Sequence, residues 1–232
     1  MPDLRKRSLA PELMDDPSVP EGEVRKALDE IEFINKWLGG YKLVLNVLDR
    51  IKLPAGVVTI MDMGSGGGDM LRKVAEWAQK KEHSVKGIGV DINPAMTRYA
   101  GNKSLQYKDI EFHTASVFDE ELTVHAPDII MCNLFAHHLD NADLVRLVRQ
   151  MNNLASRTVI INDLHRHWMA YYSIKALTSM FSHTYLVKYD APLSVARSLT
   201  RKEWKIIMKA ATISNYTIRW RWAWRWEIVI EK

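Results

Sequence analysis

The residues best suited to hold a ligand are three glycines at alternate positions with a carboxylate on either side. In residues 57–69, VVTIMDMGSGGGD, a strand-like run ends in Gly64, Gly66 and Gly68. Glycine tolerates positive φ and lets a ligand approach the main chain, and the helix expected from residue 69 offers free N–H groups at its start. A dinucleotide fingerprint needs a glycine where Asp69 stands, and Asp62 adds a second acid. The turn therefore favours a positively charged cofactor over a pyrophosphate.

A third carboxylate follows the next expected strand. Residues 85–91, VKGIGVD, end in Asp91, and Pro94 then starts a helix. Ligands of parallel sheets bind outside the carboxyl ends of the strands. We expect Asp91 to accept hydrogen bonds from ribose hydroxyl groups.

The spacing Asp62-x-Gly64-x-Gly66-x-Gly68 resembles motif I of the class I S-adenosylmethionine-dependent methyltransferases. The resemblance implies an α/β fold with a Rossmann-like, seven-stranded, mostly parallel sheet and an antiparallel C-terminal strand. It also implies S-adenosylmethionine as the cofactor. The residues expected to hold it are Asp62, Gly64, Ser65, Gly66, Gly68, Asp91, Ile92, Ser116, Val117 and Asn133.

The adenine contact departs from the family pattern. An acidic residue in the family often accepts from the adenine amino group, and Ser116 stands at that place here. Either Asp119 takes this role, or Ser116 and the backbone of Val117 do.

Residues 127–139, PDIIMCNLFAHHL, resemble motif IV of small-molecule methyltransferases. Methyltransferases of nucleic-acid amino groups instead carry an Asp/Asn-Pro-Pro-aromatic tetrad, and this stretch has no such prolines. This argues against base amino groups as the substrate. Because adjacent histidines do not ordinarily face one ion, we expect His137 and His138 to cap or pack, and we expect no metal.

His165 is the candidate general base. It follows the buried strand expected over residues 157–163, on the edge that holds the cofactor. A neutral imidazole there could take a phenolic proton. The alternative is that residues 165–167 form only the polar start of the aromatic helix over 168–181. The substrate contacts that we expect are His137, Arg166, Trp168, Tyr171 and Met14.

The 232 residues fit a single methyltransferase domain, with a helical cap over residues 1–55 and a cofactor-binding core over 56–232. Two amphipathic stretches, 23–37 and 41–51, precede the first strand and would either cover the substrate or pack on the sheet. The run Pro11–Asp16 resembles a PELMD-like segment of a bacterial subgroup of small-molecule methyltransferases, in which N-terminal elements fold over the active site.

Residues 216–230 alternate tryptophan with arginine, which predicts two antiparallel strands with the tryptophans packed against helices. The alternative is an RNA footprint made by Arg219, Arg221, Arg225 and the basic N-terminus. The net charge of +4 is mild for a nucleic-acid binder.

The single cysteine, Cys132, permits no internal disulfide, and the N-terminus lacks the apolar core of a signal peptide. We expect a cytoplasmic protein without a membrane span. The predicted function is methyl transfer, by preference to oxygen, on a small apolar phenolic, quinol or polyketide-like substrate. An RNA methyltransferase and a non-catalytic S-adenosylmethionine-binding module are the alternatives.

Overall fold

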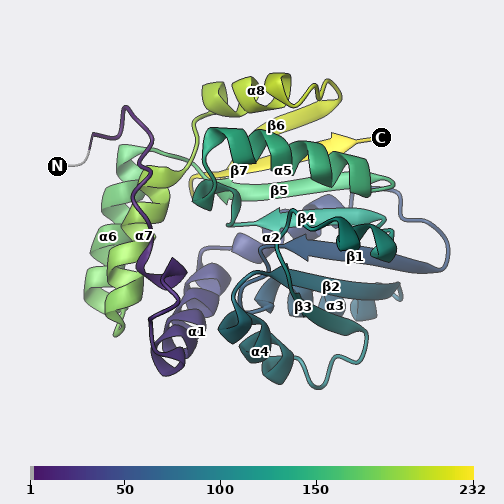
Figure 1. Ribbon diagram of the computed structural model, residues 1–232, viewed down its shortest axis with the longest axis horizontal. Coiled ribbons are helices and arrows are strands. Elements are labelled where there is room, and N and C mark those ends of the chain that lie inside the picture. The colour runs from purple at the N-terminus through teal and green to yellow at the C-terminus, as the bar shows by residue number, and fades with distance from the viewer. Residues whose placement is uncertain (1–2) are drawn as a thin grey trace.

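A seven-stranded sheet forms the centre of the molecule. The computed structural model describes residues 3–232. The strands lie in the order β3-β2-β1-β4-β5-β7-β6 (Figure 1). β1 to β5 pair in parallel, whereas β7 is antiparallel to both of its neighbours. This confirms the predicted fold class. The strands are β1 Val57–Met63, β2 Ser84–Asp91, β3 Ile110–Thr114, β4 Ile129–Asn133, β5 Thr158–Leu164, β6 Tyr216–Arg221 and β7 Arg225–Glu231.

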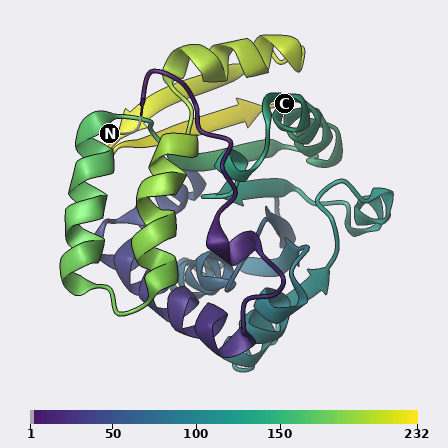
Figure 2. The same ribbon diagram turned by 60° about the vertical axis from the view of Figure 1, so that its left-hand side comes forward.

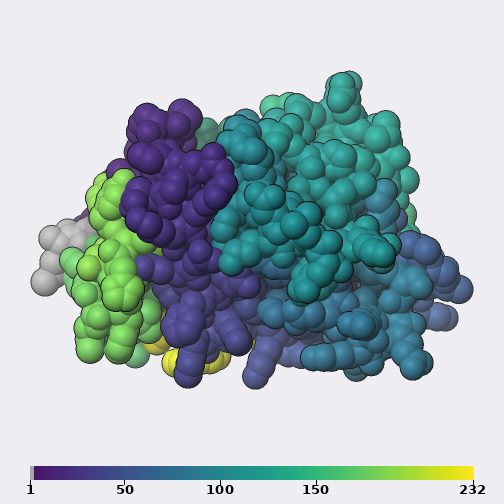
Figure 3. All heavy atoms as spheres, turned by 90° about the horizontal axis from the view of Figure 1, so that it is seen from below, coloured from purple at the N-terminus to yellow at the C-terminus, as the bar shows by residue number. Residues whose placement is uncertain are grey.

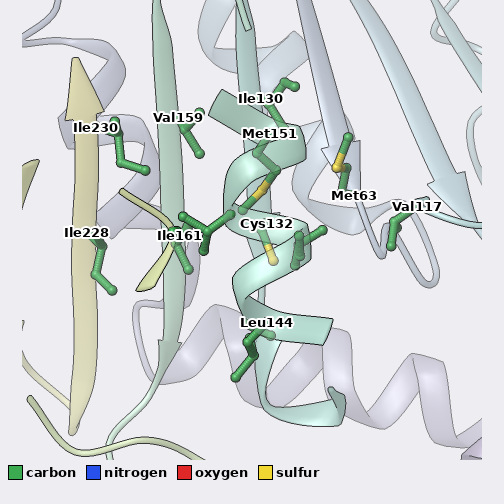
Figure 4. Packing of buried hydrophobic residues seen from close by; sticks show 14 of the residues in the cluster. Met63, Val117, Ile130, Cys132, Leu144, Met151, Val159, Ile161, Ile228 and Ile230 are labelled. Atoms are coloured by element: carbon green, nitrogen blue, oxygen red, sulfur yellow. The ribbon is translucent and has the colours of Figure 1, made fainter. Parts of the chain in front are cut away.

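Helices cover both faces of the sheet. On one face α5 (Asn141–Leu154) and α8 (Arg201–Ala210) bury their apolar sides against β4, β5 and β7, as Figure 4 shows for Leu144 and Met151 of α5. On the other face α2 (Gly40–Leu48) and α3 (Asp69–Lys80) pack over β1 and β4. The remaining helices of the sheet region are α4 (Pro94–Lys103) and the short η2 (Glu120–His125) and η3 (Ala136–His138).

Three helices lie beyond the carboxyl ends of the parallel strands: α1 (Glu21–Trp37), α6 (Trp168–Phe181) and α7 (Tyr185–Arg197) (Figures 1 and 2). α1 and α7 share a separate apolar cluster with Met14 of the short η1 (Leu13–Asp15). Of the two helices expected before the first strand, α1 therefore covers the edge where ligands bind, and α2 packs on the sheet.

The N-terminal segment is held across this edge by two arginines. Arg7 donates to the carbonyl oxygens of His137 and Leu139, and Arg197 of α7 donates to those of Ala10, His137 and His138. In the space-filling view of Figure 3 the purple N-terminal residues lie between the green helices and the teal part of the chain. Residues 3–20 thus join the cap to the loop after β4.

The C-terminal hairpin confirms two antiparallel strands but not the expected faces. β7 lies inside the sheet, so Arg225, Trp226 and Glu227 are all buried. Trp220 and Trp222 are exposed instead, by 46% and 69%. Alternation along a strand separates buried from exposed residues only where one face of the sheet meets water. Both faces of β7 are covered, so its alternating residues over 225–230 are all buried.

Over residues 3–232 no helix combines the length and the apolar character needed to cross a bilayer.

Candidate functional site

The glycine turn between β1 and α3 is built by backbone that only glycine adopts easily. Gly64, Gly66 and Gly68 have φ of 75°, 49° and 72°. A Cβ on Gly64 would lie 2.1 Å from the ring of Phe135, and one on Gly68 would lie 2.5 Å from that of Phe112. A Cβ on Gly66 would meet nothing within 4 Å. The outer glycines are therefore needed for packing, and Gly66 borders open space.

Three carboxylates surround this turn. Asp62 is 1% exposed, and its Oδ1 has no hydrogen-bond partner among residues 3–232. Burial raises the pKa of Asp62 well above its usual value, and the charges of Asp69 and Asp91 add to the effect. An unpaired buried carboxylate beside two others suits a ligand that brings positive charge. This is the fit expected for the sulfonium and ammonium groups of S-adenosylmethionine.

Asp91 lies at the end of β2, as the sequence predicts. One of its oxygens accepts from the backbone N–H of Gly66 at 2.9 Å and the other from that of Asn93 at 2.9 Å. Burial raises the pKa of Asp91 even though both hydrogen bonds lower it. Each oxygen keeps a second lone pair with which it could accept a ribose hydroxyl.

A cavity of about 760 Å³ runs from the glycine turn to the cap. Nine of the residues expected at the cofactor line it: Asp62, Gly64, Ser65, Gly66, Asp91, Ile92, Ser116, Val117 and Asn133. Gly68 is the exception, because it packs on Phe112. Of the residues expected at the substrate, Met14 and His137 line the cavity.

His165 lies outside this cavity lining. Its backbone continues the line of β5, so alternation directs Leu164 to the cavity and His165 to the ring of Trp226, at 4.6 Å between centroids. Burial lowers the pKa of His165 to about 4, and the charges of His167 and Arg166 act in the same direction. The structure therefore does not bring the predicted base to the site.

The three residues expected beside His165 also lie away from the cavity. Arg166 is buried and donates to Glu203 at 2.6 Å and to the carbonyl oxygen of Ser198 at 2.6 Å, which is a structural role. Trp168 is 60% exposed at the start of α6, and Tyr171 packs edge-on against Tyr172. The aromatic helix contributes to the cavity through other residues, Ala170, Ser173, Ile174 and Leu177.

A cluster of acids and histidines forms the polar wall of the cavity. Asp163 accepts from the backbone N–H of His137 at 2.8 Å, and its other oxygen lies 2.7 Å from Nδ1 of the same histidine. The Nε2 atom of His137 lies 3.6 Å from Glu12, which also accepts from the hydroxyl of Ser194 at 2.8 Å. His137 and Asp163 are 3% and 1% exposed. The imidazole is thus held in one orientation.

His138 completes the cluster. Its Nδ1 lies 3.0 Å from Asp15, and its Nε2 lies 3.7 Å from Glu12. Burial acts to lower the pKa of His138, but the hydrogen bond with Asp15 and the charges of Glu12 and Asp15 outweigh it, so the pKa is raised. Both rings therefore turn their Nε2 atoms towards Glu12, although the two histidines are adjacent in the chain.

One carboxylate oxygen of Glu12 and one ring nitrogen each of His137 and His138 all lie within 4.8 Å of one another. A metal ion could bridge atoms at this separation. However, Arg197 lies 3.7 Å from Glu12 and already supplies a fixed positive charge. We therefore interpret the cluster as a polar network that orients His137.

Sequence reasoning missed Glu12, Arg197 and Arg225 as residues of this region. Glu12 stands inside the quoted run Pro11–Asp16, which was the available signal. Arg225 was considered only as part of an RNA footprint, whereas it is 2% exposed and lines the cavity. Arg221 pairs with Glu227 at 2.8 Å. The three arginines therefore do not form the exposed row that an RNA footprint would need.

Comparisons with known proteins agree with this architecture. Residues 60–157 match the family model of a methyltransferase domain. No curated protein sequence matches the chain.

Many solved structures resemble most of the chain at low identity. A putative O-methyltransferase from Nostoc punctiforme aligns at 15% identity and TM-score 0.59, covering 84% of this chain and 56% of its own. This chain therefore spans little more than half the length of that protein. A putative S-adenosylmethionine-dependent methyltransferase from Methanococcus maripaludis aligns at 17% identity and TM-score 0.62, covering 90% of this chain and 93% of its own. Human N-acetylserotonin methyltransferase, solved with S-adenosylmethionine, aligns at 13% identity and TM-score 0.64, covering 92% of this chain and 56% of its own.

These structures establish the class I Rossmann-like fold, and the family model places a methyltransferase domain on the strands that carry the glycine turn, Asp91 and Asn133. Over residues 60–157 the chain is accordingly similar to a methyltransferase domain, and it shares the Rossmann-like fold of these solved structures.

Proposed function

We propose that the chain transfers a methyl group from S-adenosylmethionine to an oxygen atom of a small apolar molecule of the phenol, quinol or polyketide-like class. The observation that carries this proposal is the single cavity that joins the acidic glycine turn, an apolar cap and an oriented histidine. A non-catalytic binding module would need the first of these features and neither of the others.

The cofactor occupies the part of the cavity bordered by Asp62, Gly66 and Asp91. When bound, S-adenosylmethionine supplies a methyl group on a positively charged sulfur. Asp62 balances this charge, Gly66 leaves room for the ligand, and Asp91 accepts from the ribose. Ser116 and Val117 lie on the same side and take the adenine end, while Asn133 lies at the end of β4.

The substrate occupies the part of the cavity under the cap. Its wall is formed by apolar side chains of α1, α6 and α7, namely Leu28, Ile31, Ile34, Ile174, Leu177, Val187 and Val195. A wall of this kind selects an apolar body and gives little orientation by itself. Holding the acceptor atom in line with the methyl group and excluding water are the main tasks of such an enzyme, and good positioning alone can supply several kcal/mol.

The proton of a phenolic acceptor goes to His137. This histidine lines the cavity and is oriented by Asp163, which is the arrangement expected of a general base and its positioning carboxylate. His165 lacks both features. We therefore assign to His137 the role that the sequence suggested for His165.

The test combines binding and turnover. Calorimetry with S-adenosylmethionine should show loss of binding in Gly66→Val and, in Asp91→Ala, a weakening by about 1.5–3 kcal/mol for a lost charge-assisted hydrogen bond. Gly101→Val is the control, because Gly101 also borders open space but lies on α4 outside the cavity lining. Unchanged affinity in both Gly66→Val and Asp91→Ala would end the assignment of the cofactor site.

Turnover is then measured with labelled S-adenosylmethionine and a panel of alkylphenols, hydroquinones and RNA. Label recovered in an O-methyl ether supports the proposal. Label recovered only in RNA, or no transfer to any small molecule of a cell extract, would contradict it.

A further inference from the structure

Arg225 is a buried cation that the fold leaves without a partner. Its side chain is 2% exposed, yet Nε and Nη1 have no hydrogen-bond partner among the described residues. Its one hydrogen bond runs from Nη2 to the side-chain oxygen of Asn35, at 3.3 Å. Burial lowers the pKa of Arg225 to about 10, against the attraction of Asp163, so the guanidinium still carries its charge at neutral pH.

The other buried arginines of the described chain are paired. Arg72 donates to Glu32 and to the carbonyl oxygen of Gly67, both at 2.8 Å. Arg166 is held by Glu203 and Arg197 lies beside Glu12. An unpaired buried charge costs several kcal/mol, and buried polar groups in folded proteins are normally satisfied. Among the buried arginines of the described residues, Arg225 is therefore the one whose missing partner has to be explained.

The position of Arg225 at the cavity explains why it has no partner within the described residues. Arg225 and Asn35 both line the cavity, at the end formed by the hairpin and the last turn of α1. The start of α2 packs directly on the guanidinium, since a Cβ on Gly40 would lie 3.2 Å from Nη2. Gly39, which precedes this helix, provides no side-chain cap. A helix start that no side chain caps and a guanidinium with two unpartnered nitrogens both favour an anion such as a carboxylate.

We propose that Arg225 is the counter-ion of a carboxylate that enters the cavity with a bound ligand. This inference rests on the proposed function for the identity of the ligands and adds their acidic group. Two ligands could bring it: the cofactor, through its methionine carboxylate, or the substrate, if the apolar acceptor is an aromatic acid. The side chain of Asn162 donates to the carbonyl oxygen of Gly40 and to the side-chain oxygen of Asn133. Asn133 is the last residue of β4. Arg225 and the expected cofactor residue Asn133 both line this one cavity.

The first measurement separates a binding role from a structural role. Arg225→Met removes the unpaired charge at similar volume, so the melting temperature of the ligand-free protein should stay equal or rise. Arg72→Met is the matched control, because that guanidinium is paired, and its melting temperature should fall. If the melting temperature of Arg225→Met fell by as much as that of Arg72→Met, the inference would be overturned.

The second measurement identifies the source of the carboxylate by calorimetry. One ligand pair is S-adenosylhomocysteine and its decarboxylated analogue. The other, added with saturating S-adenosylhomocysteine, is a 2-hydroxy-6-alkylbenzoate and the corresponding 3-alkylphenol. The wild type should prefer the acid in one pair by roughly 10- to 100-fold, and Arg225→Met should lose that preference. Arg225→Lys, which keeps the charge but not the fork, should keep part of it.

The outcome also distinguishes this inference from the proposed function. If neither pair shows a preference for the acid in the wild type, or if Arg225→Met retains it, the inference fails while binding of S-adenosylhomocysteine stands. If S-adenosylhomocysteine does not bind the wild type at all, the proposed function fails first.

Discussion

At the scale of single residues, two histidines near the carboxyl ends of β4 and β5 have opposite environments. His137 lines the cavity with Asp163 on its Nδ1, whereas His165 packs against Trp226. We expect His137→Gln to lower turnover with a phenolic substrate by about 10²- to 10⁴-fold at neutral pH, with nearly intact affinity for S-adenosylmethionine. His165→Gln should leave turnover within a few-fold.

The same experiment has a pH signature. A phenol with a pKa of about 10 ionises without help at high pH, so the defect of His137→Gln should shrink there. Steady-state kinetics between neutral pH and pH 10 measure this. A defect of constant size, or full activity of His137→Gln, would mean that the histidine only orders the cavity wall.

His165 should instead affect stability in acid. Its pKa is lowered to about 4 in the folded state against about 6.5 in the unfolded chain, so the unfolded state binds the proton more readily. Its contribution to stability is complete above pH 6.5 and is lost as the pH falls towards 4. Because the ring is partly exposed, we expect His165→Gln to reduce this acid-induced loss by about 1–2 kcal/mol. Urea unfolding at pH 7 and pH 4.5 tests this, with His183→Gln, at an exposed position in the link between α6 and α7, as the control. Equal losses of stability in the wild type and both variants would refute it.

At the scale of elements, the sequence predicts what local spacing determines. The strand, glycine turn and helix around Gly64–Gly68 follow from one contiguous stretch, and so do the carboxylates Asp62 and Asp91 at the strand ends. α7 was not anticipated, because it contains Pro192 and lacks a clear amphipathic pattern. The polar wall could not be predicted either, since Glu12 meets His137 across 125 positions of the chain. Contacts of this kind depend on how the cap packs against the sheet, and the spacing of residues along the sequence does not reveal this.

The docking of the cap can be tested at Arg197. This residue of α7 donates to the carbonyl oxygens of Ala10, His137 and His138 and so ties the N-terminal segment to the loop after β4. We expect Arg197→Met to speed amide hydrogen exchange in residues 7–16 and to lower turnover, because Glu12 would lose its place beside His137. Arg5→Met is the control, as Arg5 is exposed and pairs only with Asp3 among residues 3–232. Unchanged exchange in residues 7–16 would show that other contacts hold the segment.

At the scale of the whole molecule, charge is unevenly distributed. The chain carries a net charge of +4, yet the cavity is lined by many acids: Glu12, Asp15, Glu32, Asp62, Asp69, Asp91 and Asp190. Burial raises the pKa of both Asp62 and Asp91, which shows how unfavourable these charges are without a ligand. A positively charged or zwitterionic ligand relieves this cost, whereas a pyrophosphate would add to it.

Ligand choice should therefore appear as a difference in thermal stability of the whole fold. A ligand that binds only the folded state at 100 times its Kd stabilises it by about 2.7 kcal/mol, which for a chain of this size raises the melting temperature by about 5–10 °C. S-adenosylhomocysteine should produce this shift, and NAD and NADP should produce none, because Asp69 stands where a dinucleotide turn needs glycine and faces the place of the pyrophosphate. The shift should vanish in Gly66→Val and persist in Gly101→Val. A comparable shift with NAD would mean that the acids around the turn do not select the cofactor, and the assignment of positive charge to the ligand would fall with it.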